Sequence, residues 1–169
     1  MFEIRCLTKM YKEIYRSAEI FCYPTAWKTN EVTFNDEVYG SAMSRSVRSS
    51  NIMAFWCGDD GNIQEYRNMY STARPGKVLF YLKHTITVNG RFYHHVIAKV
   101  DWFKPFTSDR LKTYFGKPVM LYRDSLFERP NSALFMPVQR IFCKFAHAKT
   151  IVEFHNAIVC IPRYRHLSI

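Results

Sequence analysis

The first part of the chain has a helical pattern of apolar residues. Between residues 2 and 22, apolar side chains recur at three- and four-residue steps, and charged side chains lie between them. Pro24 cannot continue a helical hydrogen-bond ladder, so we expect an amphipathic helix over residues 2–22. Residues 1–24 are therefore predicted to be either a helix that packs on the body of the protein or the end of an upstream domain.

From residue 30 onward the pattern changes to strands. β-branched and aromatic residues dominate, and turn residues separate the runs. The predicted strands are residues 32–39, 51–57, 77–88, 91–103, 118–122, 134–145 and 150–161. Asn89-Gly90 supplies positive φ at both central positions of a type I′ turn, so it should join two long strands as a hairpin. Residues 30–169 are expected to be a mainly β domain, either a small twisted antiparallel sheet or a partly open barrel.

Positive charge is concentrated in the second half of the chain. The formal net charge is +10, and residues 91–169 alone carry 13 basic and 5 acidic side chains. A basic surface attracts polyanions and speeds their encounter, which favours nucleic acid or another acidic partner. The alternative is a solvated basic surface that serves solubility.

The five cysteines point to a reducing compartment. Their number is odd, their spacings are wide, and no Cys-x-x-Cys pair occurs, so neither a disulfide framework nor a zinc site is indicated. A nuclear or cytoplasmic location is the simpler expectation. No apolar run approaches the roughly 20 residues of a membrane span, and the charged N-terminus does not resemble a signal peptide. No membrane partner is expected.

Basic residues beside turns and aromatic rings are the candidate nucleic-acid contacts. Residues 41–50 place two arginines among serines, and hydroxyls, backbone amides and guanidinium groups together suit phosphate oxygens. Cations interleaved with aromatic rings suit stacking on bases and neutralisation of a backbone. A solvated turn and a frayed tail are the alternatives. The candidates are Arg45, Arg48, Arg74, Lys77, Arg110, Lys112, Lys117, Arg163 and Arg165.

The segment from Val96 to Phe145 resembles the second half of a bromo-adjacent-homology (BAH) domain. The resemblance rests on three elements in order, which are Trp102-Phe103-Lys104-Pro105, Ser125-Leu126-Phe127-Glu128 and Met136-Pro137-Val138-Gln139-Arg140-Ile141-Phe142-Cys143-Lys144. The resemblance implies a β-rich interaction module of chromatin proteins, with a histone tail, a nucleosome surface or another protein as its partner.

The resemblance also implies an aromatic cage for methylated lysine. A quaternary ammonium is attracted to ring faces. Trp102 occupies the family's cage position, and Tyr81, Tyr122 and Asp109 are its candidate neighbours. The chain departs from the family's pattern at Arg110, whose charge would repel such a ligand. The alternative is that Trp102 fills the core.

The chain also resembles a family of uncharacterised proteins encoded in invertebrate and fungal genomes, often in mobile elements. The shared strings include Arg74-Pro75-Gly76-Lys77-Val78 and Phe115-Gly116-Lys117-Pro118-Val119. In those proteins the segment lies toward the C-terminus, which implies a docking domain of a transposon-encoded protein or an accessory fragment of an enzyme whose catalytic part lies upstream.

Catalytic chemistry fits the sequence poorly. His94 and His95 are adjacent on a strand, so they point to opposite faces. The hairpin register sets His84 opposite His95, but no third metal ligand accompanies them, and carboxylates are not clustered as a metal-dependent nuclease requires. We therefore expect a non-enzymatic binding module without a cofactor. It should contact chromatin or nucleic acid through a basic face, driven by the backbone and with weak sequence specificity.

Overall fold

The structure of the chain is a computed structural model. It describes residues 2–16, 18–58, 61–64, 73–106, 113–114, 117–118, 121–129, 132–152 and 154–163. One helix near the N-terminus precedes a series of strands. The helix and strands are α1 (Phe2–Tyr15), β1 (Ile20–Thr29), β2 (Glu31–Phe34), β3 (Glu37–Gly40), β4 (Asn51–Ala54), β5 (Arg74–Val88), β6 (Arg91–Pro105), β7 (Thr113–Tyr114), β8 (Lys117–Pro118), β9 (Leu121–Phe127), β10 (Phe135–Pro137), β11 (Ile141–Val152) and β12 (His155–Arg163). Two short 3-10 helices are η1 (Val47–Ser50) and η3 (Val138–Arg140).

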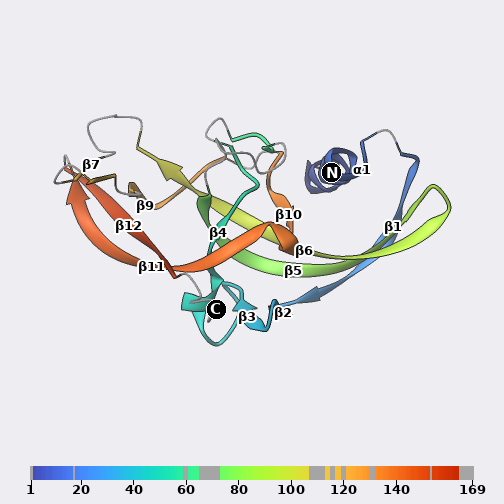
Figure 1. The fold of residues 1–169 in the computed structure, drawn as a ribbon, viewed down its shortest axis with the longest axis horizontal. Helices are drawn as coiled ribbons and strands as arrows, with labels where there is room; N and C mark the ends of the chain where they lie inside the picture. Colours follow the sequence, from blue (N-terminus) through green and yellow to red (C-terminus); the bar gives the residue numbers. More distant parts are fainter. Residues whose placement is uncertain are drawn as a thin grey trace, which may run out of the picture.

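The fold is mainly β, as the sequence predicts, and its centre is a closed antiparallel barrel of 6 strands. The strands follow the order β5, β4, β11, β12, β9 and β6, and β6 pairs with β5 to close the circle. Figure 1 shows the closed part on the left and a long extension of β5 and β6 to the right. Closure leaves no free edge on the barrel strands where they pair, which protects them from pairing with other chains.

The extension is a hairpin that the turn at Asn89-Gly90 forms. Both residues have positive φ, 48° and 79°, and Val88 pairs with Arg91 across the turn. The register also sets His84 opposite His95, as the sequence predicts. β1 pairs with the outer side of β5 along this extension. The hairpin is therefore both a wall of the barrel and a platform for the N-terminal elements.

The prediction that the first helix continues to residue 22 is wrong. α1 ends at Tyr15, and Arg16 follows with a φ of 48°, a left-handed conformation that terminates helices. Ile20 and Cys22 pair with Val88 and Ile86 of β5 instead, so the predicted segment 1–24 includes the first half of β1. Pro24 lies in that strand at the irregularity between Cys22 and Ala26, where a missing N–H is tolerated.

Three of the predicted strands are divided by turns. Residues 32–39 form the hairpin of β2 and β3, because Asn35 and Asp36 both take positive φ. Residues 134–145 are split into β10 and β11 by η3. The predicted strand 150–161 crosses the turn between β11 and β12, where Phe154 has a φ of 64°.

Two clusters of buried side chains form the core. The larger cluster joins α1 to the hairpin and to β10, and it includes Met10, Ile86 and Ile97. The smaller one is made from four barrel strands and contains Met53, Phe103, Cys143, Phe145, Ile158 and Cys160. Burial raises the pKa of Cys143 to about 11 and that of Cys160 to about 12, so both remain thiols near neutral pH. They pack as small apolar residues.

Tyrosine and histidine side chains attach α1 to the hairpin. Nε2 of His84 lies 2.7 Å from the carbonyl oxygen of Tyr23, which can only accept, so this nitrogen donates. Nδ1 is then the ring nitrogen that can accept from the Tyr11 hydroxyl, which also lies 2.7 Å away. Tyr15 makes a hydrogen bond of the same length with Nε2 of His95. The helix is thus held by polar contacts as well as by its apolar face.

Among the described residues, no helix has the length and the apolar character needed to span a membrane.

The attachment of α1 predicts a pH-dependent stability. Burial, together with the nearby His84 and His94, lowers the pKa of His95. The unfolded chain therefore takes up the proton first, at a pH of about 6.5. Stability is full above that pH and falls as the pH drops toward the folded-state pKa. The urea midpoint should decrease between pH 7.5 and 5.5.

His95→Gln should make that pH dependence shallower. His155→Gln is the matched control, because His155 is exposed at the start of β12, a strand that pairs with β11 and β9 and not with the hairpin. An equal change of slope in both variants would contradict the assignment.

Candidate functional site

A groove opens where β11 runs beyond its partner β4. The pairing of the two strands ends at Lys144 and Ile52, while β11 continues to Val152. The open space beside it has a volume of about 560 Å³. Its walls come from η1, the start of β4, β11 and the end of β12, and the lining residues are Ser46, Arg48, Ser49, Asn51, Lys144, Phe145, Ala146, His147 and Arg163. We call this space the basic groove.

Three cations reach the basic groove from separate elements. Arg48 is exposed on η1, and Arg163 is exposed at the last residue of β12. Lys144 lies directly opposite Arg163 in the β11–β12 register. Its Nζ is 2.9 Å from Oε1 of Glu37 and 5.1 Å from the ring centre of Tyr39, so this ammonium is already partly neutralised. The two arginines are the stronger candidates for an incoming anion.

Neutral polar groups complete the lining. Nδ2 of Asn51 lies 3.4 Å from Nδ1 of His147. Asn51 is buried, whereas His147 is exposed. Among the described residues that line the basic groove, none has a carboxylate. Donors therefore dominate this surface, which suits an anionic ligand.

The serine-rich loop of residues 41–50 is held by its own hydrogen bonds. The Ser44 hydroxyl donates to the carbonyl of Ser41 at 2.7 Å, and the Ser49 hydroxyl donates to the carbonyl of Ser46 at 2.5 Å. Ser41 in turn accepts from the backbone N–H of Met43. The sequence suggests these hydroxyls as phosphate ligands, but the structure uses three of them to fix the loop. These hydrogen bonds fix the conformation of the loop that carries Arg48.

Arg45 belongs to a different depression. It lines a shallow hollow together with residues 28–31, 43 and 44, and it is not part of the lining of the basic groove. The sequence groups Arg45 with Arg48 because they are three residues apart. The turn of the loop directs them into separate spaces.

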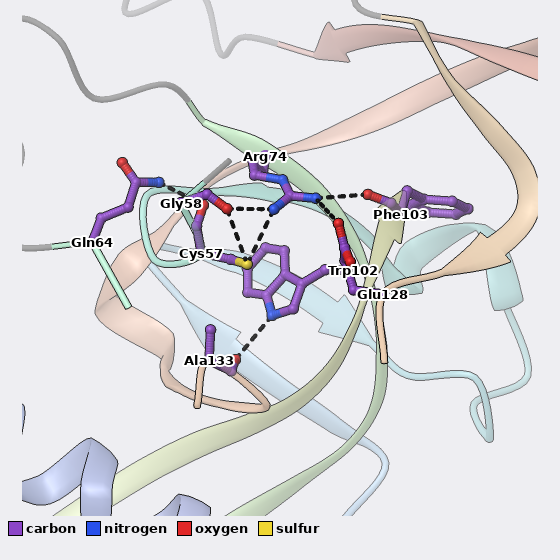
Figure 2. A network of polar contacts seen from close by, with 8 residues as sticks. All are labelled: Cys57, Gly58, Gln64, Arg74, Trp102, Phe103, Glu128 and Ala133. Atoms are coloured by element: carbon purple, nitrogen blue, oxygen red, sulfur yellow. Dashed lines mark hydrogen bonds and ion pairs between the residues drawn. The ribbon is translucent and has the colours of Figure 1, made fainter. Parts of the chain in front are cut away.

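Arg74 is not a nucleic-acid contact, because it is fully buried. Figure 2 shows its guanidinium inside a polar network. One terminal nitrogen donates to the carbonyl of Gly58 at 2.5 Å, and the other donates to the carbonyl of Phe103 at 2.9 Å and to Oε1 of Glu128 at 3.3 Å. Sγ of Cys57 lies 3.3 Å from the first nitrogen. This arginine joins the start of β5 to the end of β6 and to the segment after β9.

Trp102 and Tyr81 do not form an open aromatic cage. Trp102 is 2% exposed, and its indole N–H donates to the carbonyl of Ala133 at 2.9 Å (Figure 2). Tyr81 is completely buried, and its hydroxyl donates to the carbonyl of Gly40 at 3.1 Å. Tyr122 packs against the smaller core cluster. The cage prediction is therefore wrong for Trp102 and Tyr81, because packing covers their ring faces.

The remaining predicted residues do not extend the basic groove. Lys77 is half-buried opposite Asp101 of β6. Burial raises the pKa of Asp101, while Lys99 and Lys77 oppose that rise. For Lys117 the structure describes the backbone only, in β8. Asp109, Arg110, Lys112 and Arg165 lie outside the described residues.

Sequence reasoning missed Lys144, Asn51 and His147. One signal for Lys144 was available, because it stands between the apolar Cys143 and Phe145 on a predicted strand and must therefore face away from them. The pairing of β11 with β4 and β12 brings it to the same place as Arg48 and Arg163. That pairing is long-range and has no local sequence signal.

Comparison with models of protein families, with curated proteins and with solved structures found no match. The resemblances to BAH domains and to mobile-element proteins stay predictions.

The buried guanidinium predicts a large effect on stability. Arg74→Ala would leave the carbonyls of Gly58 and Phe103 without this donor and Glu128 without its cation. We expect the free energy of unfolding to fall by about 3 kcal/mol in urea denaturation. Arg129→Ala removes an exposed arginine nearby and should change stability little. Similar losses for both variants would contradict the structural role of Arg74.

The tight packing of the loop against Gly40 predicts a second effect on stability. A Cβ at Gly40 would lie 2.0 Å from Oγ of Ser49 and 2.5 Å from Oγ of Ser44. Gly40→Ala should therefore displace the loop and lower stability by about 1–3 kcal/mol. Adding Ser49→Ala should recover part of that loss, and a double-mutant cycle measures the coupling. Strict additivity would exclude this contact.

Proposed function

We propose that this chain is a non-enzymatic nucleic-acid-binding domain whose basic groove accepts phosphate groups of the polynucleotide backbone. The observation that supports the proposal is the convergence of Arg48, Lys144 and Arg163 from η1, β11 and β12 on one groove. Their separation in sequence means that only the fold brings them together. The chain's net charge of +10 favours the same class of partner.

The chemistry of the two arginines fits phosphate. A guanidinium donates two parallel hydrogen bonds to phosphate oxygens, and it keeps its charge at any physiological pH. Within the described part of the chain, no carboxylate makes an ion pair with Arg48 or Arg163. An incoming phosphate would therefore meet donors that require no exchange of an internal partner. Contacts of this kind position a backbone and carry little sequence information.

The burial of two cysteine thiols and the hydrogen bonds of His84 support a binding role over a catalytic one. The thiols of Cys143 and Cys160 are buried and their pKa values are raised, so they are poor nucleophiles. His84 uses both ring nitrogens in hydrogen bonds with Tyr11 and Tyr23.

The salt dependence of binding tests the proposal. Fluorescence anisotropy with a labelled duplex and with nucleosomes, over a series of salt concentrations, should show a linear fall of log K with log salt. Arg48→Ala and Arg163→Ala should each weaken binding and reduce the magnitude of the slope by about 1, because each removes one phosphate contact.

Lys9→Ala is the matched control, because it removes one exposed cation from α1. Binding that barely responds to salt would instead favour an apolar protein-docking role. An equal loss of affinity in Lys9→Ala would show that binding depends on the net charge of the protein and not on contacts in the basic groove.

A further inference from the structure

One face of the β1–β5–β6 extension carries a row of exposed aromatic side chains. Phe21 pairs with Thr87, and Thr87 pairs with Phe92, so these residues point to the same side of the sheet. Trp27 pairs with Lys83, four residues from Thr87 along β5 and therefore on that side too. We call Phe21, Tyr23, Trp27 and Phe92 the aromatic face.

The aromatic face lies opposite the helix. His84 and His95 contact α1, and the residues next to them along each strand point the other way. Figure 1 shows α1 over one side of the extension. The sheet thus has one side packed on the helix and one side on which large rings meet solvent.

Three of these rings are exposed, and two of the three are connected through Tyr23. Phe21 is 60% exposed, Phe92 is 67% exposed and Trp27 is 81% exposed. Tyr23 links two of them, with ring centres 5.3 Å from Phe21 and 6.2 Å from Phe92. Single exposed apolar residues are ordinary, but a contiguous group of them on one face indicates an interaction site.

The charge of the extension indicates what kind of partner fits. Residues 20–30 and 74–100 contain no aspartate and no glutamate. Lys83 is exposed beside Trp27 on this face, whereas Arg91 precedes Phe92 and points to the helix side of the hairpin. His94 lies on the aromatic face as well, with Nδ1 2.9 Å from the Thr85 hydroxyl. Glu19, the residue before β1, is exposed and is hydrogen-bonded through its backbone to Asn89 of the turn, so one carboxylate lies at that end. Flat rings beside a lysine complement a polyanion that also has flat apolar groups.

We propose that the aromatic face binds single-stranded nucleic acid. Its bases stack on Phe21, Phe92 and Trp27, and a phosphate lies near Lys83. Alternate residues along a strand are about 6.6 Å apart, so Trp27, opposite Lys83, lies two such steps from Phe21 and Phe92, which both lie at the level of Thr87. A duplex keeps its base faces stacked inside, whereas a single strand exposes them. The inference does not require the basic groove, which contacts phosphates and lies on other elements.

Tryptophan fluorescence gives a direct readout of stacking. Trp56 and Trp102 are 1% and 2% exposed, so an added ligand reaches Trp27. Titration with an unlabelled oligothymidylate of 20 nucleotides should quench the emission of Trp27 and saturate. The same titration of Trp27→Phe should show no comparable quenching while anisotropy with a labelled oligonucleotide still reports binding.

Substitutions at Phe92 separate stacking from general hydrophobicity. Phe92→Ala should weaken oligothymidylate binding about tenfold, whereas Phe92→Tyr should retain it. Phe92→Leu keeps an apolar side chain without a ring, so it should resemble the alanine variant. Phe154→Ala is the matched control, because that ring is fully exposed at the turn between β11 and β12. Circular dichroism and a urea midpoint establish that each variant is folded.

Three results would overturn the proposal. The first is oligothymidylate binding that Phe92→Ala leaves unchanged. The second is equal binding by Phe92→Leu and the original chain, which points to an apolar protein partner. The third is a dimer in sedimentation equilibrium that Phe92→Ala dissociates without any change in oligonucleotide affinity, which assigns the face to a second copy of the chain. Arg48→Ala could also lose duplex binding and keep oligothymidylate binding. That result would show that single strands do not use the basic groove, and it would support the aromatic face as a separate site.

Discussion

The pairing of β5 with β6 is the constraint on which the rest of the structure depends. Each strand has 15 residues, and their register extends from Gly76 and Trp102 at the barrel to Val88 and Arg91 at the turn. One end closes the barrel, and the other end carries α1 and β1. Because a shift of one residue would exchange the two faces of one strand relative to the other, sliding β6 would turn Phe92 toward the helix and His95 away from it.

The barrel end of this hairpin is stabilised by a buried charge. Arg74 begins β5, and its guanidinium reaches the carbonyls of Gly58 and Phe103 and the carboxylate of Glu128. A buried guanidinium is costly unless it is paired and hydrogen-bonded. Because hydrogen bonds are directional, those of Arg74 fix the relative positions of segments that are distant in the sequence more precisely than apolar contacts do. Because its guanidinium is buried in this network, Arg74 does not contribute to the basic surface.

Features set by neighbouring residues could be predicted from the sequence, and features set by distant ones could not. Asn89-Gly90 fixes its hairpin, and the opposition of His84 and His95 follows from it. The end of α1 was missed because the apolar pattern continues into Ile20 and Phe21, which pair with β5. Arg74 stands beside Pro75-Gly76 and therefore has the local pattern of a surface turn. At the basic groove, Arg48 and Arg163 were identified singly, but only strand pairing shows that they meet at Lys144.

The imidazole of His84 also imposes an order of assembly. It connects the Tyr11 hydroxyl to the carbonyl of Tyr23, so it joins the first helix and the first strand through a ring that is synthesised later. A helix of 14 residues has little stability alone. During translation, the apolar stripe of α1 cannot be buried until the hairpin has left the ribosome. The helix therefore reaches its native packing only after β5 and β6 have been synthesised, and its apolar stripe is exposed until then.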